Sequence, residues 1–111
     1  MSRSTPAAAS EYLDRHVRTD RLTDLLKNCD YVINVLPSTE ATRGLLNGDI
    51  LANCSDKKSV FVNIGRGSII NETDLVKALK NNWISGAILD VFEEEPLSRD
   101  SKLWKLPQVI L

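Results

Sequence analysis

Apolar residues along the chain gather in four short runs that predict β-strands. The runs cover residues 31–36, 59–64, 87–89 and 109–111. Each run is apolar almost without interruption instead of alternating with polar positions, a pattern typical of strands buried on both faces of a parallel sheet. Pro37 closes the first run, a Gly-Arg-Gly turn at 65–67 closes the second, and Asp90 follows the third.

Between these strands, apolar residues recur at the spacing of an α-helix. In residues 20–27, Leu22, Leu25 and Leu26 fall on one face, and Thr19 is placed to cap the start of that helix. A shorter helix is expected over residues 49–53.

The most regular helix is expected over residues 72–80. Its buried stripe would consist of Leu75, Val76 and Leu79, and Asn71 precedes it as the expected N-cap. Acidic residues occupy the first turn and lysines lie towards the end, which complements the helix dipole.

This alternation of strands and helices predicts βαβ units, and therefore an α/β protein with a doubly wound parallel sheet. Ligands of such sheets bind beyond the carboxyl ends of the strands. The polar segments that follow the first three strands are therefore the candidate site, and they cover residues 36–44, 65–67 and 90–96.

Composition narrows the functional classes. The chain has 111 residues, 42% hydrophobic and 26% charged, which is ordinary for one globular domain. A formal net charge of −1 gives no general reason to expect nucleic acid or an anionic membrane as partner. No apolar stretch approaches the roughly 20 residues that span a bilayer, and the first ten residues lack the apolar core of a secretory signal. Cys29 and Cys54 lack CxxC spacing, so we interpret them as reduced intracellular thiols and expect no metal site.

Each candidate site residue also has an ordinary structural explanation. An arginine between two glycines, such as Arg66, is usually a solvated turn residue, and the acidic run 93–95 is typical of a solvated loop. Asp90 can simply cap the turn after its strand. Their occurrence at successive strand ends favours a shared site, because those ends meet along one edge of a parallel sheet.

Two motifs in these segments resemble the signature of the D-isomer-specific 2-hydroxyacid dehydrogenases. They are Asn63-Ile64-Gly65-Arg66-Gly67, and Leu89-Asp90-Val91-Phe92 continuing to Glu95-Pro96. The earlier segment Asn34-Val35-Leu36-Pro37-Ser38-Thr39, with Thr42-Arg43-Gly44, matches the same family. The resemblance runs from Ser2 to Leu111, and its motifs are nearest to those of glyoxylate and hydroxypyruvate reductases.

The resemblance implies catalytic roles for two residues. Arg66 would hold the substrate carboxylate and stabilise the alkoxide that forms at the carbonyl, since a guanidinium can do both. Glu95 matches the glutamate that pairs with the family's catalytic histidine and favours its protonated form. Gly65 and Gly67 would let the backbone approach the cofactor.

The same resemblance implies a cofactor surface. Asp90 matches the residue that accepts a hydrogen bond from the nicotinamide carboxamide. The other expected contacts come from the strand ends and the loop after the first strand; they are Leu36, Pro37, Thr42, Ile64, Gly65 and Arg66.

The opening residues bear on the choice between NAD and NADP. Ser2-Arg3-Ser4 resembles the Ser-Arg-Ser of NADP-using members, where NAD enzymes carry an acidic residue that binds the ribose hydroxyls. Ser2 and Arg3 would accept the 2′-phosphate without repulsion, so NADP is the preferred cofactor, with NAD as the alternative.

By this resemblance the chain, residues 1–111, holds only part of an NAD(P)-binding domain. No G-x-G-x-x-G phosphate loop is present, and in the strand order 3-2-1-4-5-6 the run 31–36 would be strand 4. The expected fold is a partial Rossmann-type doubly wound sheet that lacks its first βα unit and the substrate domain, with an unpaired edge at 31–36. His16 lies upstream of every motif, so the catalytic histidine is expected beyond Leu111.

The first functional hypothesis is therefore an oxidoreductase fragment. Its full-length form, a cytoplasmic homodimer by the resemblance, would transfer a hydride between NAD(P)H and a small 2-oxoacid such as glyoxylate or hydroxypyruvate. The alternative is a non-enzymatic, cofactor-sensing interaction module related to the C-terminal-binding corepressors, which resemble the enzymes at the same positions. The particular substrate stays open, because the substrate domain forms much of that pocket.

Overall fold

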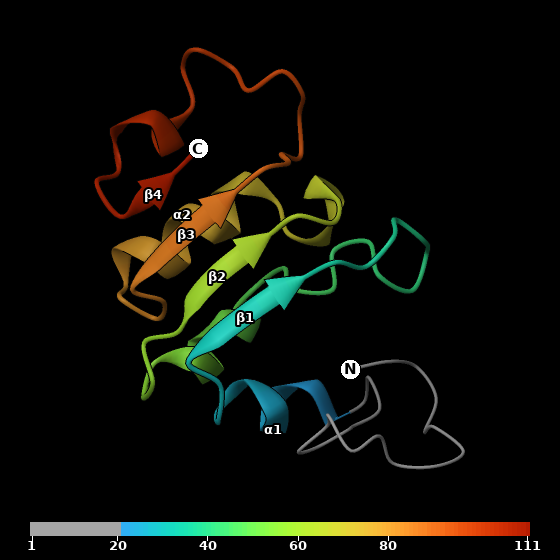
Figure 1. Cartoon of the computed structure of the whole chain (residues 1–111), viewed down its shortest axis with the longest axis vertical. Coiled ribbons are helices and arrows are strands. Elements are labelled where there is room, and N and C mark those ends of the chain that lie inside the picture. The colour runs from blue at the N-terminus through green and yellow to red at the C-terminus, as the bar shows by residue number, and fades with distance from the viewer. Residues whose placement is uncertain (1–20) are drawn as a thin grey trace.

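The computed structural model describes residues 21–111, which form a four-stranded sheet with every neighbouring pair of strands parallel (Figure 1). The strands are β1 (Tyr31–Asn34), β2 (Val60–Asn63), β3 (Gly86–Leu89) and β4 (Val109–Ile110), and they lie side by side in chain order. The α-helices are α1 (Leu22–Leu26) and α2 (Glu72–Lys80); the 3-10 helices are η2 (Ile50–Cys54), η3 (Gly67–Ile69) and η4 (Lys102–Lys105). The predicted α/β class with a parallel sheet is confirmed.

Every predicted strand is present, although the ends differ. β1 stops at Asn34 because the backbone N–H of Leu36 turns back and donates to the Asn34 side-chain oxygen (3.1 Å). The short helix expected over 49–53 is the 3-10 helix η2, in which backbone amides bond three residues back. η3 and η4 were not predicted, because they are too short to show a period.

The predicted helices are also present. Thr19 lies outside the described residues, and Arg21 holds the N-cap position of α1 without a side-chain cap. The most regular helix, α2, spans 72–80 as predicted. None of the helices between residues 21 and 111 is long and apolar enough to cross a membrane.

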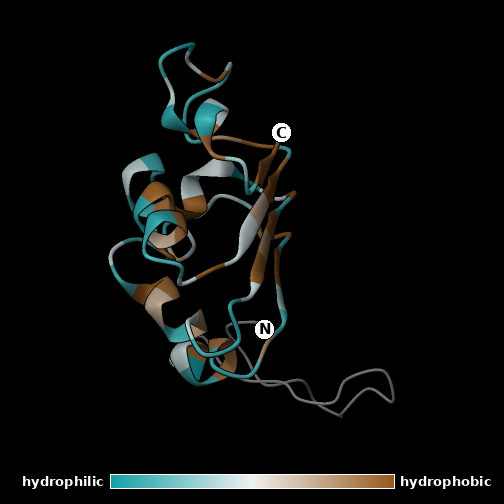
Figure 2. Ribbon diagram, turned by 90° about the vertical axis from the view of Figure 1, so that its left-hand side faces the viewer, coloured by the Kyte–Doolittle hydropathy of each residue, from teal (hydrophilic) through white to brown (hydrophobic). Residues whose placement is uncertain are grey.

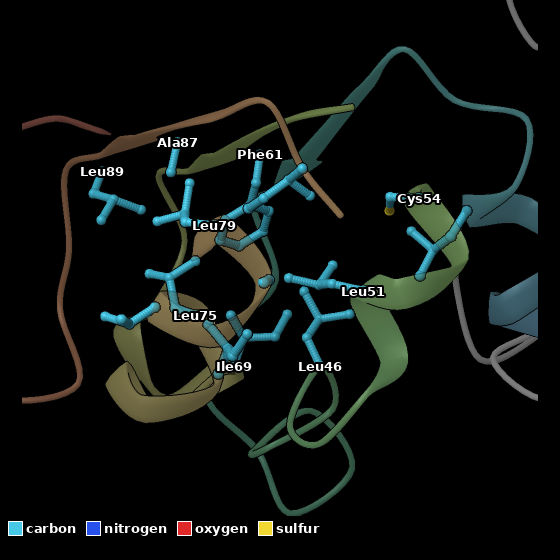
Figure 3. Close-up of a cluster of buried hydrophobic side chains, with 14 of the residues drawn as sticks. Leu46, Leu51, Cys54, Phe61, Ile69, Leu75, Leu79, Ala87 and Leu89 are labelled. Atoms are coloured by element: carbon cyan, nitrogen blue, oxygen red, sulfur yellow. The ribbon is translucent and has the colours of Figure 1, made fainter. Parts of the chain in front are cut away.

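The helices pack on one face of the sheet, and the core lies between the two layers (Figure 2). Phe61 and Ala87 point from β2 and β3 towards Leu75 and Leu79 of α2 (Figure 3). Leu51 of η2 extends the same cluster towards β1. The predicted stripe of α2 is buried, which explains why this helix forms where its apolar spacing placed it.

The opposite face of the sheet is largely uncovered, which we call the open face. Ile33, Ile88 and Ile110 are 59%, 41% and 62% exposed. Together with Val62 they form one row across all four strands, because the register pairs each with the next. The prediction of burial on both faces is therefore wrong for residues 21–111. Crossovers between successive parallel strands share one hand, so a sheet that grows in a single direction receives all its helices on the same side.

β1 forms one edge of the described sheet, as expected for residues 31–36. An apolar pocket of about 190 Å³ runs along this strand. Its lining includes Leu22 and Leu26 of α1, together with Leu45 and Ile69. The edge strand is thus apolar both on its outer face and in the groove beside it.

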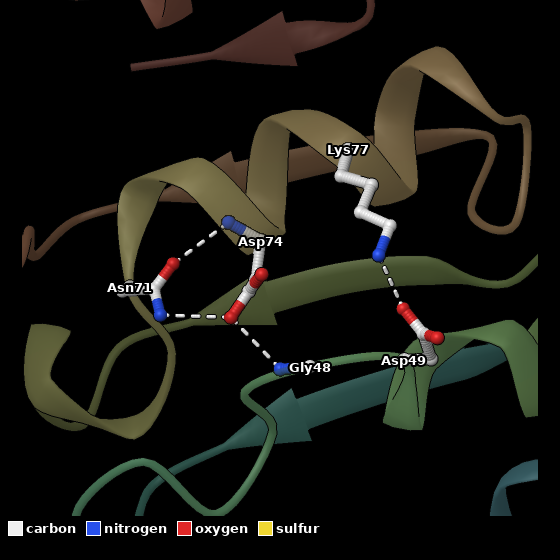
Figure 4. A network of polar contacts seen from close by, with 5 residues as sticks. All are labelled: Gly48, Asp49, Asn71, Asp74 and Lys77. Atoms are coloured by element: carbon white, nitrogen blue, oxygen red, sulfur yellow. Dashed lines mark hydrogen bonds and ion pairs between the residues drawn. The ribbon is translucent and has the colours of Figure 1, made fainter.

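A polar network fixes the start of α2 (Figure 4). Asn71 accepts a hydrogen bond from the Asp74 backbone N–H (2.7 Å), which confirms it as the N-cap. The Asp74 carboxylate in turn accepts from the Asn71 side chain (2.7 Å) and from the Gly48 backbone N–H (2.8 Å). One turn later Lys77 pairs with Asp49, and this hydrogen bond raises the pKa of Lys77. The network joins α2 to the loop before η2.

We predict that the 111-residue chain alone does not unfold cooperatively from a soluble monomer. Each large apolar side chain left in water forgoes about 1.5–3 kcal/mol, and an intact domain has only about 5–15 kcal/mol of net stability. The open face and the β1 edge together expose enough apolar surface to remove that margin. A thermal melt followed by circular dichroism, with size-exclusion chromatography, measures this. A cooperative melt from a monomer would contradict it.

Candidate functional site

The parallel hydrogen-bond ladder continues past the ends of the strands. The Ile64 N–H donates to the Asn34 carbonyl (3.1 Å), and the Asp90 N–H donates to the Asn63 carbonyl (3.0 Å). The segments after β1, β2 and β3 therefore leave the sheet at the same edge, where the arrowheads of these strands lie in Figure 1. The candidate segments predicted from the sequence meet there.

A pocket of about 300 Å³ opens at this edge. The segment after β2 contributes Arg66 to its lining and the segment after β3 contributes Glu95, so the structure brings the two predicted catalytic residues together. The remaining lining residues are Ser38, Gly67, Ser68, Val91, Phe92 and Glu93. The Arg66 side chain is exposed, and one of its guanidinium N–H groups donates to the Gly65 carbonyl (3.3 Å).

Gly67 allows the segments after β2 and β3 to meet backbone to backbone. A Cβ atom on Gly67 would overlap the carbonyl group of Phe92 and the backbone nitrogen of Glu93. A Cβ atom on Gly65 would lie 2.8 Å from the Leu36 carbonyl oxygen, against the segment after β1. Both glycines are therefore required by close packing within the protein, a reason that the sequence did not indicate.

The acidic run 93–95 divides into three different environments. Glu95 accepts a hydrogen bond from the Phe92 backbone N–H (3.1 Å), which closes the turn that carries it. Glu93 accepts from the Glu72 backbone N–H (3.2 Å) at the start of α2. Glu94 is exposed. The run is thus more than a solvated loop, because two of its carboxylates shape the segment that lines the pocket.

The loop after β1 is held by its own threonines. The Thr42 hydroxyl donates to the Pro37 carbonyl (2.6 Å) and accepts from the Thr39 backbone N–H (2.9 Å). Ser68 donates to Ser38 across the gap to the Arg66 segment (2.9 Å). Thr42 was predicted as a cofactor contact, and in this structure its hydroxyl organises the loop that carries Pro37.

Two buried asparagines join the segments after β1 and β2. Asn34 and Asn63 are partners in the strand register and are 4% and 2% exposed. The Asn34 amide N–H donates to the Asn63 side-chain oxygen (2.8 Å), and the Asn63 amide N–H donates to the Arg66 carbonyl (3.1 Å). Sequence reasoning missed this pair. Its signal was an asparagine near the carboxyl end of each of two apolar runs.

The remaining predicted site residues fall into two groups. Ile64, Pro37 and Asp90 are exposed at the carboxyl edge, and Ile64 is 53% exposed despite its apolar side chain. Ser2 and Arg3 lie outside the described residues, as does His16, so the predictions made for them stay predictions.

The part of the chain that the structure describes contains neither a metal-ligand cluster nor a disulfide. Across residues 21–111 no group of three or more histidine, cysteine, aspartate or glutamate side chains could hold a metal ion. Cys29 and Cys54 are both free thiols. Burial raises the pKa of Cys54, which keeps that thiol protonated at neutral pH.

Comparison with known proteins gives the family of the chain. The family model described as "D-isomer specific 2-hydroxyacid dehydrogenase, NAD binding domain" matches residues 1–111. A glyoxylate reductase of Pyrococcus horikoshii is 44% identical over 90 residues, which make up 81% of this chain and 26% of that protein.

Solved structures give the same result. A D-isomer-specific 2-hydroxyacid dehydrogenase from Xanthobacter autotrophicus Py2, in complex with NADPH, superposes with a TM-score of 0.88 at 36% identity, over 98% of this chain and 44% of that one. An NADPH-dependent glyoxylate/hydroxypyruvate reductase from Sinorhizobium meliloti gives 0.85 at 35% identity, over 97% and 43%.

The parallel sheet, with its pocket beyond the carboxyl ends of the strands, defines a dinucleotide-binding α/β domain. The chain belongs to the D-isomer-specific 2-hydroxyacid dehydrogenase family and matches its NAD-binding domain. It spans between 26% and 32% of the length of the glyoxylate and glyoxylate/hydroxypyruvate reductases it matches.

We predict that Gly67→Ala destabilises the longer protein that carries this chain. Overpacking usually costs about 1–3 kcal/mol, and here the loss should reach or pass the upper value because both sides of the contact are backbone. Denaturant unfolding measures the free energy. Gly48→Ala is the matched control: its φ of +74° is strained for alanine but nothing lies within 4 Å of the added Cβ, so it should cost only about 1 kcal/mol. Equal losses for the two variants would contradict the prediction.

Proposed function

We propose that this chain is part of the cofactor-binding domain of a longer reductase. That enzyme transfers a hydride from NADPH to a small 2-oxoacid such as glyoxylate or hydroxypyruvate. The observation that carries the proposal is the pocket shared by Arg66 and Glu95 at the carboxyl edge of the sheet. The substrate class is supported by relatives named glyoxylate reductase and glyoxylate/hydroxypyruvate reductase.

Arg66 is assigned to the substrate. A 2-oxoacid has a carboxylate next to a carbonyl whose oxygen gains negative charge as it is reduced. A guanidinium pairs with carboxylate oxygens through two parallel N–H groups and also stabilises a developing alkoxide. The hydrogen bond to the Gly65 carbonyl uses one N–H group of Arg66, so others remain for a ligand.

Glu95 is assigned as the partner of a histidine that another part of the longer protein contributes. A carboxylate beside an imidazole favours the protonated form, which can then deliver a proton to the alkoxide oxygen. One Glu95 oxygen accepts from the Phe92 backbone N–H, which orients the carboxylate and leaves its second oxygen for the imidazole.

The exposed strand-end residues fit the nicotinamide end of a dinucleotide. Ile64 and Pro37 offer apolar surface for a flat ring, and the Asp90 carboxylate can accept from a carboxamide N–H. Leu36 and Thr42 are assigned to the same surface through the loop that the Thr42 hydroxyl holds. When bound, the cofactor supplies the hydride; these residues bind and orient it.

NADPH is proposed over NADH on the basis of Ser2 and Arg3, and solved relatives in complex with NADPH support it. The family resemblance is also the basis for proposing a cytoplasmic homodimer. A corepressor-like, non-enzymatic module is less well supported, because the relatives that match carry the names of reductases.

The activity is tested on the longer protein with glyoxylate and hydroxypyruvate, by following NADPH oxidation. We expect turnover, and we expect Arg66→Lys to reduce kcat/KM by on the order of a hundredfold, since an ammonium cannot make the bidentate contact. Both the KM of the 2-oxoacid and kcat should change. Arg99→Lys, at an exposed arginine that does not line the pocket, is the control and should behave as the parent. A parent enzyme without turnover on either acid would disprove the proposal.

The cofactor preference has its own test. Arg3→Asp should weaken NADPH binding while sparing NADH, because a carboxylate repels the 2′-phosphate that an arginine attracts. Cofactor fluorescence titrations of the parent and the variant measure both dissociation constants. Equal affinity of the parent for the two cofactors would remove Ser2 and Arg3 from this role.

A further inference from the structure

The buried amides of Asn34 and Asn63 form a connected polar group with four hydrogen bonds. Asn63 accepts two hydrogen bonds on its side-chain oxygen, from the Asn34 amide (2.8 Å) and from the Gly65 backbone N–H (3.2 Å). It donates one to the Arg66 carbonyl (3.1 Å). Asn34 accepts from the Leu36 backbone N–H (3.1 Å).

These contacts go to the backbone immediately around the site residues. Asn63 holds the residue before Arg66 by its N–H and Arg66 itself by its carbonyl. Asn34 holds the backbone of Leu36 on the neighbouring segment. The pair therefore links the segment that carries the guanidinium to the segment that carries part of the proposed cofactor surface.

Burial makes this link stiff. When the partner of a buried amide moves away, water cannot replace the lost hydrogen bond. The desolvation penalty of the amide is then uncompensated, so its hydrogen bonds resist displacement. The close approach at Gly65 tightens the arrangement further, since a Cβ there would lie 2.9 Å from the Asn34 amide nitrogen. A rotation of the Arg66 backbone would break its contact with Asn63, the residue that Asn34 holds in turn.

We propose that Asn34 and Asn63 are positioning residues that act through Arg66 and fix its guanidinium relative to the segment after β1. This inference rests on the proposed function, in which Arg66 binds the 2-oxoacid. Neither asparagine needs to touch substrate or cofactor. Misplacement of a catalytic group by about 1 Å can cost on the order of a hundredfold in rate, so a modest backbone shift is sufficient for a large kinetic effect.

The experiment is a double-mutant cycle in the longer protein, with glyoxylate and hydroxypyruvate as substrates and NADPH as the reductant. Asn63→Ala should raise the KM of the 2-oxoacid and lower kcat, with kcat/KM reduced at least about tenfold. In the Arg66→Lys background the same change should cost less than about twofold, because a residue that acts through Arg66 has little further effect once the guanidinium is gone. Asn34→Ala should give a smaller loss of the same kind, since the contact between Asn63 and Arg66 remains.

Asn53→Ala is the matched control. It removes a part-buried asparagine amide that donates to the Ile50 carbonyl within η2 (2.8 Å) and does not line the pocket. It should lower Tm and leave KM and kcat unchanged.

Three outcomes would overturn the inference. Equal fold-losses from Asn63→Ala in the parent and Arg66→Lys backgrounds would show that Asn63 acts independently of Arg66. If Asn63→Ala does not fold, Asn34→Ala decides, and parental KM and kcat in that variant would also disprove the inference. An inactive parent protein would overturn the proposed function and this inference together, whereas an active parent with independent losses would overturn the inference alone.

Discussion

The backbone contact between Gly67 and the Phe92–Glu93 peptide is the constraint on which the pocket depends. Arg66 and Glu95 lie 29 positions apart in the chain, and their segments are brought together where a glycine lets two backbones touch. Any side chain at Gly67 would push the segment after β3 away from the segment after β2. The ladder hydrogen bond from Asp90 to Asn63 keeps the two segments parallel up to that point.

The two faces of the sheet are covered differently in the described structure. One face packs against α1, η2 and α2 and contains the core (Figure 3). The open face has an apolar row but no helix from residues 21–111. The carboxyl edge, where the pocket opens, is separate from both faces, and its segments are held by the hydrogen bonds described above.

Much of this arrangement could be predicted from the sequence. The four apolar runs located the strands, the stripe of Leu75, Val76 and Leu79 located α2, and Asn71 was correctly expected as its cap. The positions of Arg66 and Glu95 on one pocket followed from the rule that parallel strands end at the same edge. Local patterns determine these features, so the sequence was sufficient for them.

The features that were missed depend on contacts between distant segments. The spacing of the strands does not show that Gly67 touches Phe92, or that Asn34 and Asn63 face each other in register. Burial on both faces was inferred from the nearly uninterrupted apolar runs, and such runs do not reveal on which side of the sheet the crossovers lie. The contact of Glu93 with the start of α2, and that of Thr42 with Pro37, likewise appear only once the backbone is known.

The contact from the Glu93 carboxylate to the first turn of α2 ties the acidic side of the pocket to the start of that helix. The Glu72 N–H that donates to Glu93 follows directly on Asn71, whose side chain caps the same turn. The segment that carries Glu95 therefore depends on the capped start of α2, whereas the segment that carries Arg66 depends on buried amides between strands. The two sides of the pocket thus take their order from different layers of the fold, one from the helical layer and one from the sheet.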